Sequence, residues 1–480
     1  MKKNVLLLIS FFLYTQSSLA DQYHYNNILI GDRAIGFAGA YGGISDDASG
    51  VFYNPAGLAY ALSNDISGSA NAIYSKKVVY KKTVGDSDFK ENSGGTLPSF
   101  FGGLQKLDGL AKGLVFAFGV YTTDSELKDQ NDLIKDVNLN TPSNCLILDA
   151  NGVPAKDENG NVKAGVNRPP IRLARFHRSI NERAATLYAG GGLGWRIRSN
   201  FSVGVALNYV AVDELVQEYQ DVRTETTSCN TQTGGFSEKT EQKGQNIRQH
   251  LVGYGVQPVL GLQAVFGKLS LGLTLKLGRF LAQSFDQSLE LRSNLLVKAD
   301  QDSVDAAKGA YTPASSSLIL EYDNIVKSNN PLGSMPKNLT LGLAYFYSTR
   351  LAWSFDLKHY TAVTNSEEME GSGALYRRGA VTDFATGIEY YLLPAFPLRV
   401  GLFTNHDSRP KIDKKKSGQA DHIDYNGLTT FLAWVQPNSQ VGAGVILQQG
   451  VGEAQKLGNS VVQTVEANAF TFAFSASHSF

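Results

Sequence analysis

Two motifs close to the start of the chain combine residue types that form rigid, hydrogen-bonded turns. Asp46 and Asp47 are adjacent carboxylates, and Asn54-Pro55-Ala56 follows in the same segment. Pro55 fixes φ and removes a hydrogen-bond donor, while the Asn54 side chain bonds to nearby backbone, so this motif predicts a rigid turn. The two carboxylates either accept hydrogen bonds from the surrounding protein or cap a short helix, and the sequence favours neither role.

A second candidate site is the stretch "RPPIRLARFHR", which ends at residue 178. It interleaves apolar residues with four arginines: Arg168, Arg172, Arg175 and Arg178. Because arginine binds carboxylates and phosphates through two parallel hydrogen bonds, the stretch could clamp the acidic head of a ligand that has an apolar tail. Contact with phosphate groups at the rim of a membrane is the simpler interpretation.

No motif predicts an enzyme or a cofactor. Gly43-Ile44-Ser45 lacks the closing glycine of a nucleophile elbow, and the seven histidines are scattered along the chain. The formal net charge is zero, with 44 basic and 44 acidic residues. There is therefore no electrostatic case for nucleic acid as a partner.

The first twenty residues have the pattern of a secretory signal peptide. Basic residues precede an apolar run, and small residues flank a cleavage position after Ala20. The mature chain is therefore expected to begin at Asp21, outside the inner membrane. In an oxidising compartment the two cysteines, Cys145 and Cys229, predict one disulfide, and two free thiols remain the alternative.

The elements that must position these residues are β-strands. In "LSLGLTLKL", residues 269–277, leucine alternates with smaller or polar residues, and "LTLGLAYFY", residues 339–347, repeats the pattern. Short turns separate neighbouring segments of this kind at 198–200, 267–268 and 349–350. The 48 glycines and the 10% content of Phe, Trp and Tyr also favour an all-β chain.

Charged residues within these segments lie opposite the large apolar side chains. They are Arg196, Lys276, Asp356, Lys358, Glu389 and Arg399. Alternation of this kind fits either a soluble sandwich or a membrane barrel. Segment lengths of about ten residues, which match one tilted crossing of a bilayer, and oily faces rich in leucine and aromatic residues favour the barrel.

Counting the segments predicts an antiparallel transmembrane β-barrel of about fourteen strands over residues 63–480. Short turns are then expected at the periplasmic end, with long extracellular loops near 122–183, 214–248 and 281–336. The final segment ends in Phe480, and a terminal aromatic residue resembles the signal by which bacterial outer-membrane barrels are recognised for insertion. A closed barrel has no free edge, so a monomer is expected.

Residues 21–62 precede the first strand and are too long for a simple leader. A fourteen-stranded barrel has a lumen wider than its own side chains fill, so this segment is expected to plug the lumen as a hatch. Its sequence "GFAGAYGGISDDASGVFYNPAGLA" resembles the N-terminal hatch of the FadL/TodX family of outer-membrane transporters. The matching steps are Asp46-Asp47-Ala48 and Asn54-Pro55-Ala56. Segments beginning at Leu97, Met335 and Phe384 also resemble later strands of this family.

This resemblance implies a bacterial outer-membrane channel for passive uptake of long-chain fatty acids or similar hydrophobic compounds. The ligand would be captured at the extracellular loops, pass a lumen pocket beside the hatch and leave through a defect in the barrel wall, which no residue locates. The expected partners are a hydrophobic small molecule, outer-membrane lipid and lipopolysaccharide, the last at the arginine stretch. The alternative is a non-transporting barrel that serves as a secretion or surface-protein assembly partner.

Overall fold

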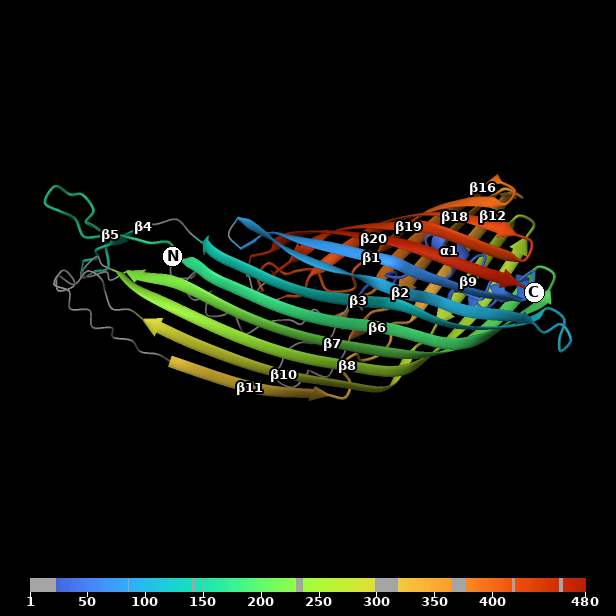
Figure 1. Cartoon of the computed structure of the whole chain (residues 1–480), viewed down its shortest axis with the longest axis horizontal. Helices are drawn as coiled ribbons and strands as arrows, with labels where there is room; N and C mark the ends of the chain where they lie inside the picture. Colours follow the sequence, from blue (N-terminus) through green and yellow to red (C-terminus); the bar gives the residue numbers. More distant parts are fainter. Residues whose placement is uncertain are drawn as a thin grey trace.

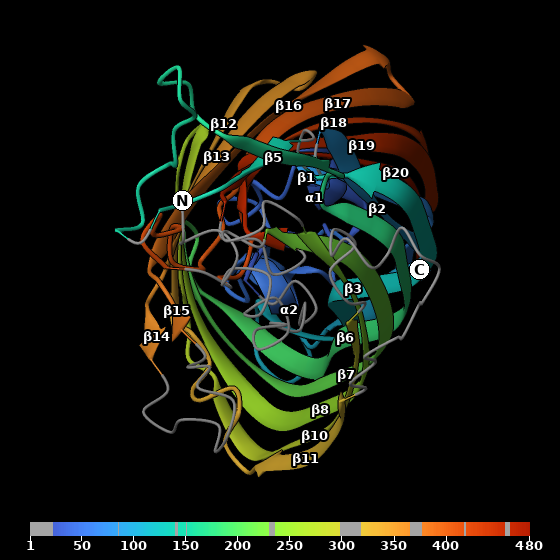
Figure 2. The same ribbon diagram turned by 90° about the vertical axis from the view of Figure 1, so that its left-hand side faces the viewer.

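Antiparallel strands close into a ring in the computed structural model of the chain (Figures 1 and 2). The structure describes residues 23–84, 86–139, 143–149, 151–229, 236–297, 318–364, 377–416, 419–456 and 461–480. The main sheet has 16 strands, and β8 pairs with both β9 and β10. β10 lies beside β8 beyond the end of β9, and β11 lies beside β10, so neither adds a strand to the ring. Fourteen strands therefore form the barrel, and the predicted all-β fold is confirmed.

The ring follows the order of the chain and closes between its last and first strands. Its strands are β1 (Asp65–Val84), β2 (Ser87–Lys106), β3 (Leu114–Asn138), β6 (Arg172–Arg198), β7 (Phe201–Cys229), β8 (Phe236–Phe266), β9 (Leu269–Lys276), β12 (Asn338–Ser348), β13 (Leu351–Tyr360), β16 (Val381–Leu393), β17 (Phe396–Asn405), β18 (His422–Gln436), β19 (Ser439–Ala454) and β20 (Gln463–Ser479). Outside it lie β4 (Ser143–Leu146), β5 (Ala164–Arg168), β10 (Arg279–Val297), β11 (Leu318–Ser328), β14 (Val363–Thr364) and β15 (Arg377–Arg378). Tight turns join the strands at one end, the turn end, and longer connections lie at the opposite loop end.

Alternation along the strands places large apolar side chains on the outside of the ring. Exposed examples are Phe116, Phe118, Leu193, Trp195, Leu207, Leu262, Leu341, Trp353, Leu402, Trp434 and Phe474. A soluble protein rarely exposes so large an apolar surface, whereas the outer face of a membrane barrel must be apolar to meet lipid. The charges opposite these residues point into the lumen.

Strand length differs strongly around the ring. β9, β12, β13 and β17 contain 8, 11, 10 and 10 residues, close to the roughly 9 to 11 residues of one tilted crossing. β6, β7 and β8 contain 27, 29 and 31 residues. We call β3, β6, β7, β8 and β10 the tall wall, because they extend far beyond the short strands, toward the left of Figure 1.

The tall wall corrects the predicted loops at 122–183, 214–248 and 281–336, which are largely strand. β3 and β6 occupy the two ends of the first range, β7 and β8 most of the second, and β10 and β11 parts of the third. Beyond the membrane the outer face of a strand no longer needs large apolar residues. On β7 the exposed outward positions change from Leu207 to Asp213, so the oily alternation that identifies the membrane strands is absent there.

The chain before β1 folds inside the ring, where Figure 2 shows it in blue. This hatch contains the short helices α1 (Asp32–Gly36) and α2 (Gly50–Tyr53) and the 3₁₀ helix η3 (Gly57–Tyr60). Its apolar residues, among them Ile30, Ile35, Phe37 and Leu58, are almost completely buried. No helix among the described residues is long and apolar enough to cross a membrane. The predicted signal peptide, residues 1–20, lies outside the described residues.

Candidate functional site

The inner wall holds the hatch through charged side chains. Asp356 of β13 accepts hydrogen bonds from the backbone N–H groups of Tyr41 and Gly42 at 3.0 and 2.9 Å. Lys358, two residues further along the same face, donates to the side-chain oxygen of Asn26 at 3.3 Å. These bonds satisfy hatch groups that are buried inside the barrel and would otherwise lose their solvation.

Alternating charges join the hatch to β16 and β17 near the turn end. Arg399, which is 1% exposed, pairs with Asp32 of the hatch at 3.3 Å and with Glu389 at 2.7 Å. Arg33 of the hatch pairs with Glu389 at 2.9 Å and with Asp46 at 3.0 Å. Each charge thus has an opposite neighbour, which is required because an uncompensated buried charge is strongly destabilising. Asp46 therefore supports Arg33, which makes the contact with the wall.

Asp47 forms hydrogen bonds with other residues of the hatch. It accepts hydrogen bonds from the backbone N–H and the hydroxyl of Ser49, at 2.9 and 2.5 Å, immediately before α2. The Tyr41 hydroxyl lies 2.8 Å from a carboxylate oxygen of both Asp46 and Asp47. One hydroxyl proton cannot satisfy both carboxylates at once. Burial, and then the charge of Asp46, raise the pKa of the Asp47 carboxyl.

The Asn54 side chain joins two hatch turns to the wall. Its nitrogen donates to the carbonyl groups of Gly42, at 2.9 Å, and Leu262 of β8, at 3.2 Å. Its oxygen accepts the backbone N–H of Ala56 at 3.1 Å. Asn54 is fully buried, and Pro55 and Ala56 are buried beside it. The structure therefore places the Asn-Pro-Ala motif at the contact between hatch and wall.

A belt of wall glycines lets the hatch backbone approach the strands directly. We call the following residues the glycine belt: Gly194, Gly204, Gly261, Gly272, Gly342, Gly387 and Gly401. They come from β6, β7, β8, β9, β12, β16 and β17, and a Cβ atom at any of them would overlap hatch atoms. At Gly272 and Gly342 the overlapped atoms belong to the backbone of Gly42 and Gly43, and Pro55 lies against the belt on β6 and β7. At these seven positions the hatch therefore fits only against a residue without a side chain.

A cavity of about 110 Å³ lies on the loop-end side of the hatch, and one water occupies roughly 10–15 Å³ on the same measure. Its lining includes the aromatic rings of Tyr25, Phe52, Tyr188, Phe280 and Tyr360 and the basic side chains of Lys276 and Arg378. The Lys276 ammonium lies 3.4 Å from the centre of the Phe52 ring, and Tyr25 stacks on Tyr360 at a centroid distance of 4.2 Å. This central cavity can therefore hold an apolar body and, beside it, an acidic group.

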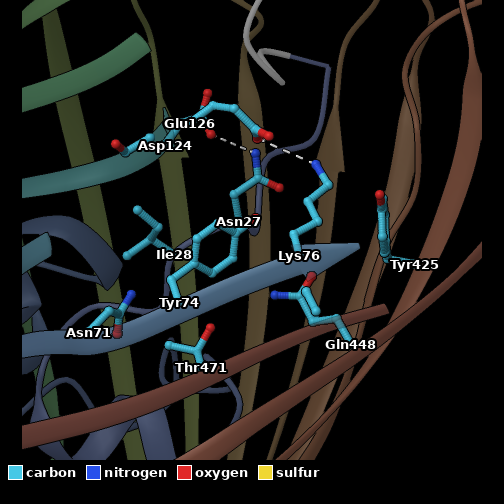
Figure 3. Close-up of a pocket in the computed structure, with 12 residues that line it drawn as sticks. Asn27, Ile28, Asn71, Tyr74, Lys76, Asp124, Glu126, Tyr425, Gln448 and Thr471 are labelled. Carbon is cyan, nitrogen blue, oxygen red and sulfur yellow. Dashed lines mark hydrogen bonds and ion pairs between the residues drawn. The ribbon is translucent and has the colours of Figure 1, made fainter. Parts of the chain in front are cut away.

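A second pocket, the seam pocket, lies where the hatch meets β1 and β3 (Figure 3). Asn27 of the hatch donates a hydrogen bond to Asp124 of β3 at 2.9 Å, and Lys76 of β1 pairs with Glu126 of β3 at 3.4 Å. Asp124 also lines the central cavity. The hatch, the strand β3 and both cavities therefore meet at this residue.

A third pocket, the charged pocket, lies nearer the loop end and is surrounded by ion pairs. Glu91 is paired with Lys128, Arg178 and Lys456 at 3.5, 2.6 and 3.2 Å. Arg178 also pairs with Glu218 at 2.5 Å. Paired charges therefore line the lumen at this level as well as beside the hatch.

The four arginines of the sequence stretch do not form one site. Arg178 is buried in the lumen, where the two glutamates hold it. Arg172 and Arg175 are about half exposed and form ion pairs with acidic residues on neighbouring strands. The side chain of Arg168 lies outside the described part of the chain. A common clamp built from all the described arginines is therefore absent.

The barrel wall separates between β2 and β3. Backbone pairing of these strands stops at Phe100 and Tyr121, although β2 continues against β1 and β3 continues against β6. A β-bulge in β3 between Thr122 and Asp124 marks this point. Further along, the side chain of Gln130 bridges the two strands by hydrogen bonds to backbone of β2. We call this unpaired interval the β2–β3 seam.

A disulfide joins Cys145 of β4 to Cys229 at the end of β7. It fastens the excursion that contains β4 and β5 to the tall wall, across a sequence separation of 84 residues. It lies at the loop end, away from the hatch.

No family model matches the chain, and no curated protein matches it. Among solved structures, it is similar to a FadL homologue from Pseudomonas aeruginosa, with a TM-score of 0.53, 11% identity, and coverage of 96% of this chain and 100% of that chain. It is also similar to the toluene transporter TodX of P. putida, with a TM-score of 0.51, 13% identity, and coverage of 95% and 99%. The chain has the fold of bacterial outer-membrane β-barrel channels. At these identities the similarity to the FadL homologue and TodX concerns the fold alone.

Sequence reasoning missed most of the central cavity. Its residues come from the hatch and from several strands that are far apart in sequence. Lys276 is the exception, because the alternation predicts that its side chain lies opposite the lipid-facing residues. Nothing in the sequence near Tyr188 or Arg378 indicates that they meet in one cavity.

Proposed function

We propose that the protein is a passive outer-membrane channel for hydrophobic compounds, with its loop end facing the cell exterior. The observation that carries this proposal is the central cavity, a space lined by aromatic rings between the hatch and the loop end of a closed barrel. A hydrophobic solute gains roughly 0.8 kcal/mol for each methylene group it buries. Transfer from water into the cavity therefore needs no energy source.

The β2–β3 seam is the exit in this proposal. Tyr121 lies in the eighth position of β3, which begins at Leu114, so the seam opens near the end of a crossing of about 9 to 11 residues. Asp124 touches both the cavity and the seam pocket. A ligand that displaces Asn27 from Asp124 would release the hatch from the seam and reach the lipid sideways.

Two measurements test the proposal on the purified mature protein. The first is saturable binding of oleate and of toluene in detergent. The second is transfer of a pyrene-labelled alkyl chain from cyclodextrin into the lipid of lipopolysaccharide-containing vesicles, with vesicles lacking the protein as background. We expect saturable binding of at least one ligand and transfer above background. A protein that binds neither and retains another protein instead would favour the secretion-partner function.

A disulfide across the seam tests the exit. A Cβ atom at Gly95 of β2 would lie 3.8 Å from the Cβ of Leu127 of β3, the spacing of about 3.8 Å found in disulfides. We expect the oxidised Gly95→Cys/Leu127→Cys variant to bind ligand normally but to transfer it more slowly, with recovery on reduction. Each single cysteine variant, and the unmodified protein with reductant, are the controls. Unchanged transfer in the cross-linked variant would exclude this seam as an exit.

A further inference from the structure

The ring has a second unpaired interval on the opposite border of the tall wall. β9 pairs with β12 up to Lys276 and Asn338, and β10 pairs with β11 only from Phe285 and Ser328 onward. Between these points, residues 277–284 remain beside β8. No backbone pairing joins them to residues 329–337, all of which the structure describes. Figure 2 shows β10 and β11 continuing from β8, away from β12.

Residues 329–337 turn into the lumen instead of completing the wall. Leu332 and Met335 are 0% and 6% exposed. Met335 sits in a notch made by two glycines, because a Cβ at Gly255 would come within 2.5 Å of its Cε and a Cβ at Gly278 within 2.5 Å of its Sδ. The notch is therefore shaped around one flexible, unbranched side chain.

Side chains rather than a strand ladder hold this segment in place. Gln283 accepts the backbone N–H of Leu332 at 2.8 Å and donates to the carbonyl of Gly333 at 2.9 Å. Arg378 donates to the carbonyl of Leu332 at 3.2 Å. Such a segment lacks the cooperative backbone ladder of a paired strand, and local stability follows local contacts, so we expect it to open more readily than a paired strand.

The segment lies between the central cavity and the outer surface of the barrel. Met335 lines the cavity together with Phe280. On the outside, Leu281 and Tyr254 are 67% and 45% exposed, as expected for the apolar and aromatic residues at the edge of a membrane band. β9 contains 8 residues, so the interval begins near the end of one crossing, as the β2–β3 seam does.

We propose that residues 329–337 close a second lateral port from the central cavity into the membrane, which opens when an unbranched alkyl chain takes the place of Met335 in the glycine notch. The central cavity would then have one exit at each border of the tall wall, since its lining includes Asp124 at the β2–β3 seam and Met335 at this port. The proposal rests on the channel function proposed above.

The seam-locked Gly95→Cys/Leu127→Cys variant isolates this port. We expect it to retain transfer above background in the vesicle assay. Adding Met335→Ala should increase the remaining transfer roughly fivefold. This is the factor that corresponds to an opening barrier lower by about 1 kcal/mol. Leu341→Ala, which removes an exposed lipid-facing side chain on β12, is the matched control and should change nothing.

A second cross-link closes the port. A Cβ at Gly278 would lie 2.8 Å from the Cβ of Met335, so a small retreat of the segment brings a Gly278→Cys/Met335→Cys pair to disulfide spacing. With both cross-links formed, which mass spectrometry verifies, transfer should fall to background while ligand binding persists. Equal transfer in the singly and doubly locked proteins, or no effect of Met335→Ala, would overturn the port. If the unmodified protein transfers nothing, the channel function itself fails.

Discussion

Asn54 attaches the hatch to the wall with one buried side chain, and its removal tests that attachment. Asn54→Ala leaves the carbonyl groups of Gly42 and Leu262 without these donors, at a cost of about 1–3 kcal/mol. We expect faster hydrogen exchange in the hatch, with unchanged exchange in the barrel strands. Asn151→Ala, at an exposed turn of the β4–β5 excursion, is the control. Equal exchange in the two variants would contradict the role of Asn54.

His406 lies beside a carboxylate that also binds the hatch. A hydrogen bond of 2.7 Å to Asp383 raises the pKa of His406 above its ordinary value of about 6.5. Because the folded pKa is the higher one, this stabilisation is fully present below the unfolded pKa and is lost as pH rises through the raised folded value. Asp383 also binds Asn26 of the hatch at 3.3 Å.

We therefore expect hydrogen-exchange protection of residues 23–27, corrected for intrinsic rates, to fall as pH rises above about 6.5. His406→Gln should flatten this dependence. A dependence that persists in His406→Gln would assign it to another group.

The motif residues of the hatch could be recognised from sequence because their chemistry is local. Asn54 and Pro55 form a turn with their own neighbours, so three adjacent letters indicate it. The partners Leu262 and Glu389 are hundreds of residues away and have no comparable signature. The arginine stretch is continuous in sequence, which suggests a single site, but its partners are also distant in sequence. In the structure Arg178 points into the lumen, whereas Arg172 and Arg175 are half exposed.

Among the elements, the glycine belt determines whether the hatch fits. Gly272→Ala would place a methyl group on the backbone of Gly42, and overpacking of this kind costs about 1–3 kcal/mol. We expect the variant barrel to keep its resistance to unfolding in detergent while the hatch becomes sensitive to protease. Gly68→Ala is the matched control, because a Cβ there meets only ordinary contacts, the nearest at 3.5 Å. Comparable cleavage of the two hatches would contradict the role of the belt.

Strand existence was predictable, whereas strand pairing was not. Alternating leucines identify segments such as β9 and β12, because the side-chain period is two wherever one face meets lipid. The β2–β3 seam cannot be recognised in this way, because the side chains of a strand still alternate between its two faces when one neighbouring strand is unpaired. The upper parts of β7 and β8 were missed for a related reason, as both of their faces carry polar residues.

For the whole molecule, the two borders of the tall wall share one architecture. At each border a long strand continues while its neighbour separates, at the β2–β3 seam and between β10 and β12. The central cavity reaches both borders. Where the strands cross the membrane, all neighbours are therefore paired and the backbone groups are hydrogen-bonded. The wall is unpaired only near the edge of the membrane, where irregular backbone lines a cavity.

The charges that hold the hatch have an electrical consequence once the hatch is gone. The wall side chains that bind the hatch carry both signs, since Lys358 and Arg399 are basic and Asp356 and Glu389 are acidic. Deleting residues 21–60 removes their partners and leaves a wet tunnel. In planar bilayers we expect large, steady ion currents, against a nearly silent unmodified protein. The attachment points of the plug thus become the charged lining of the pore it leaves behind.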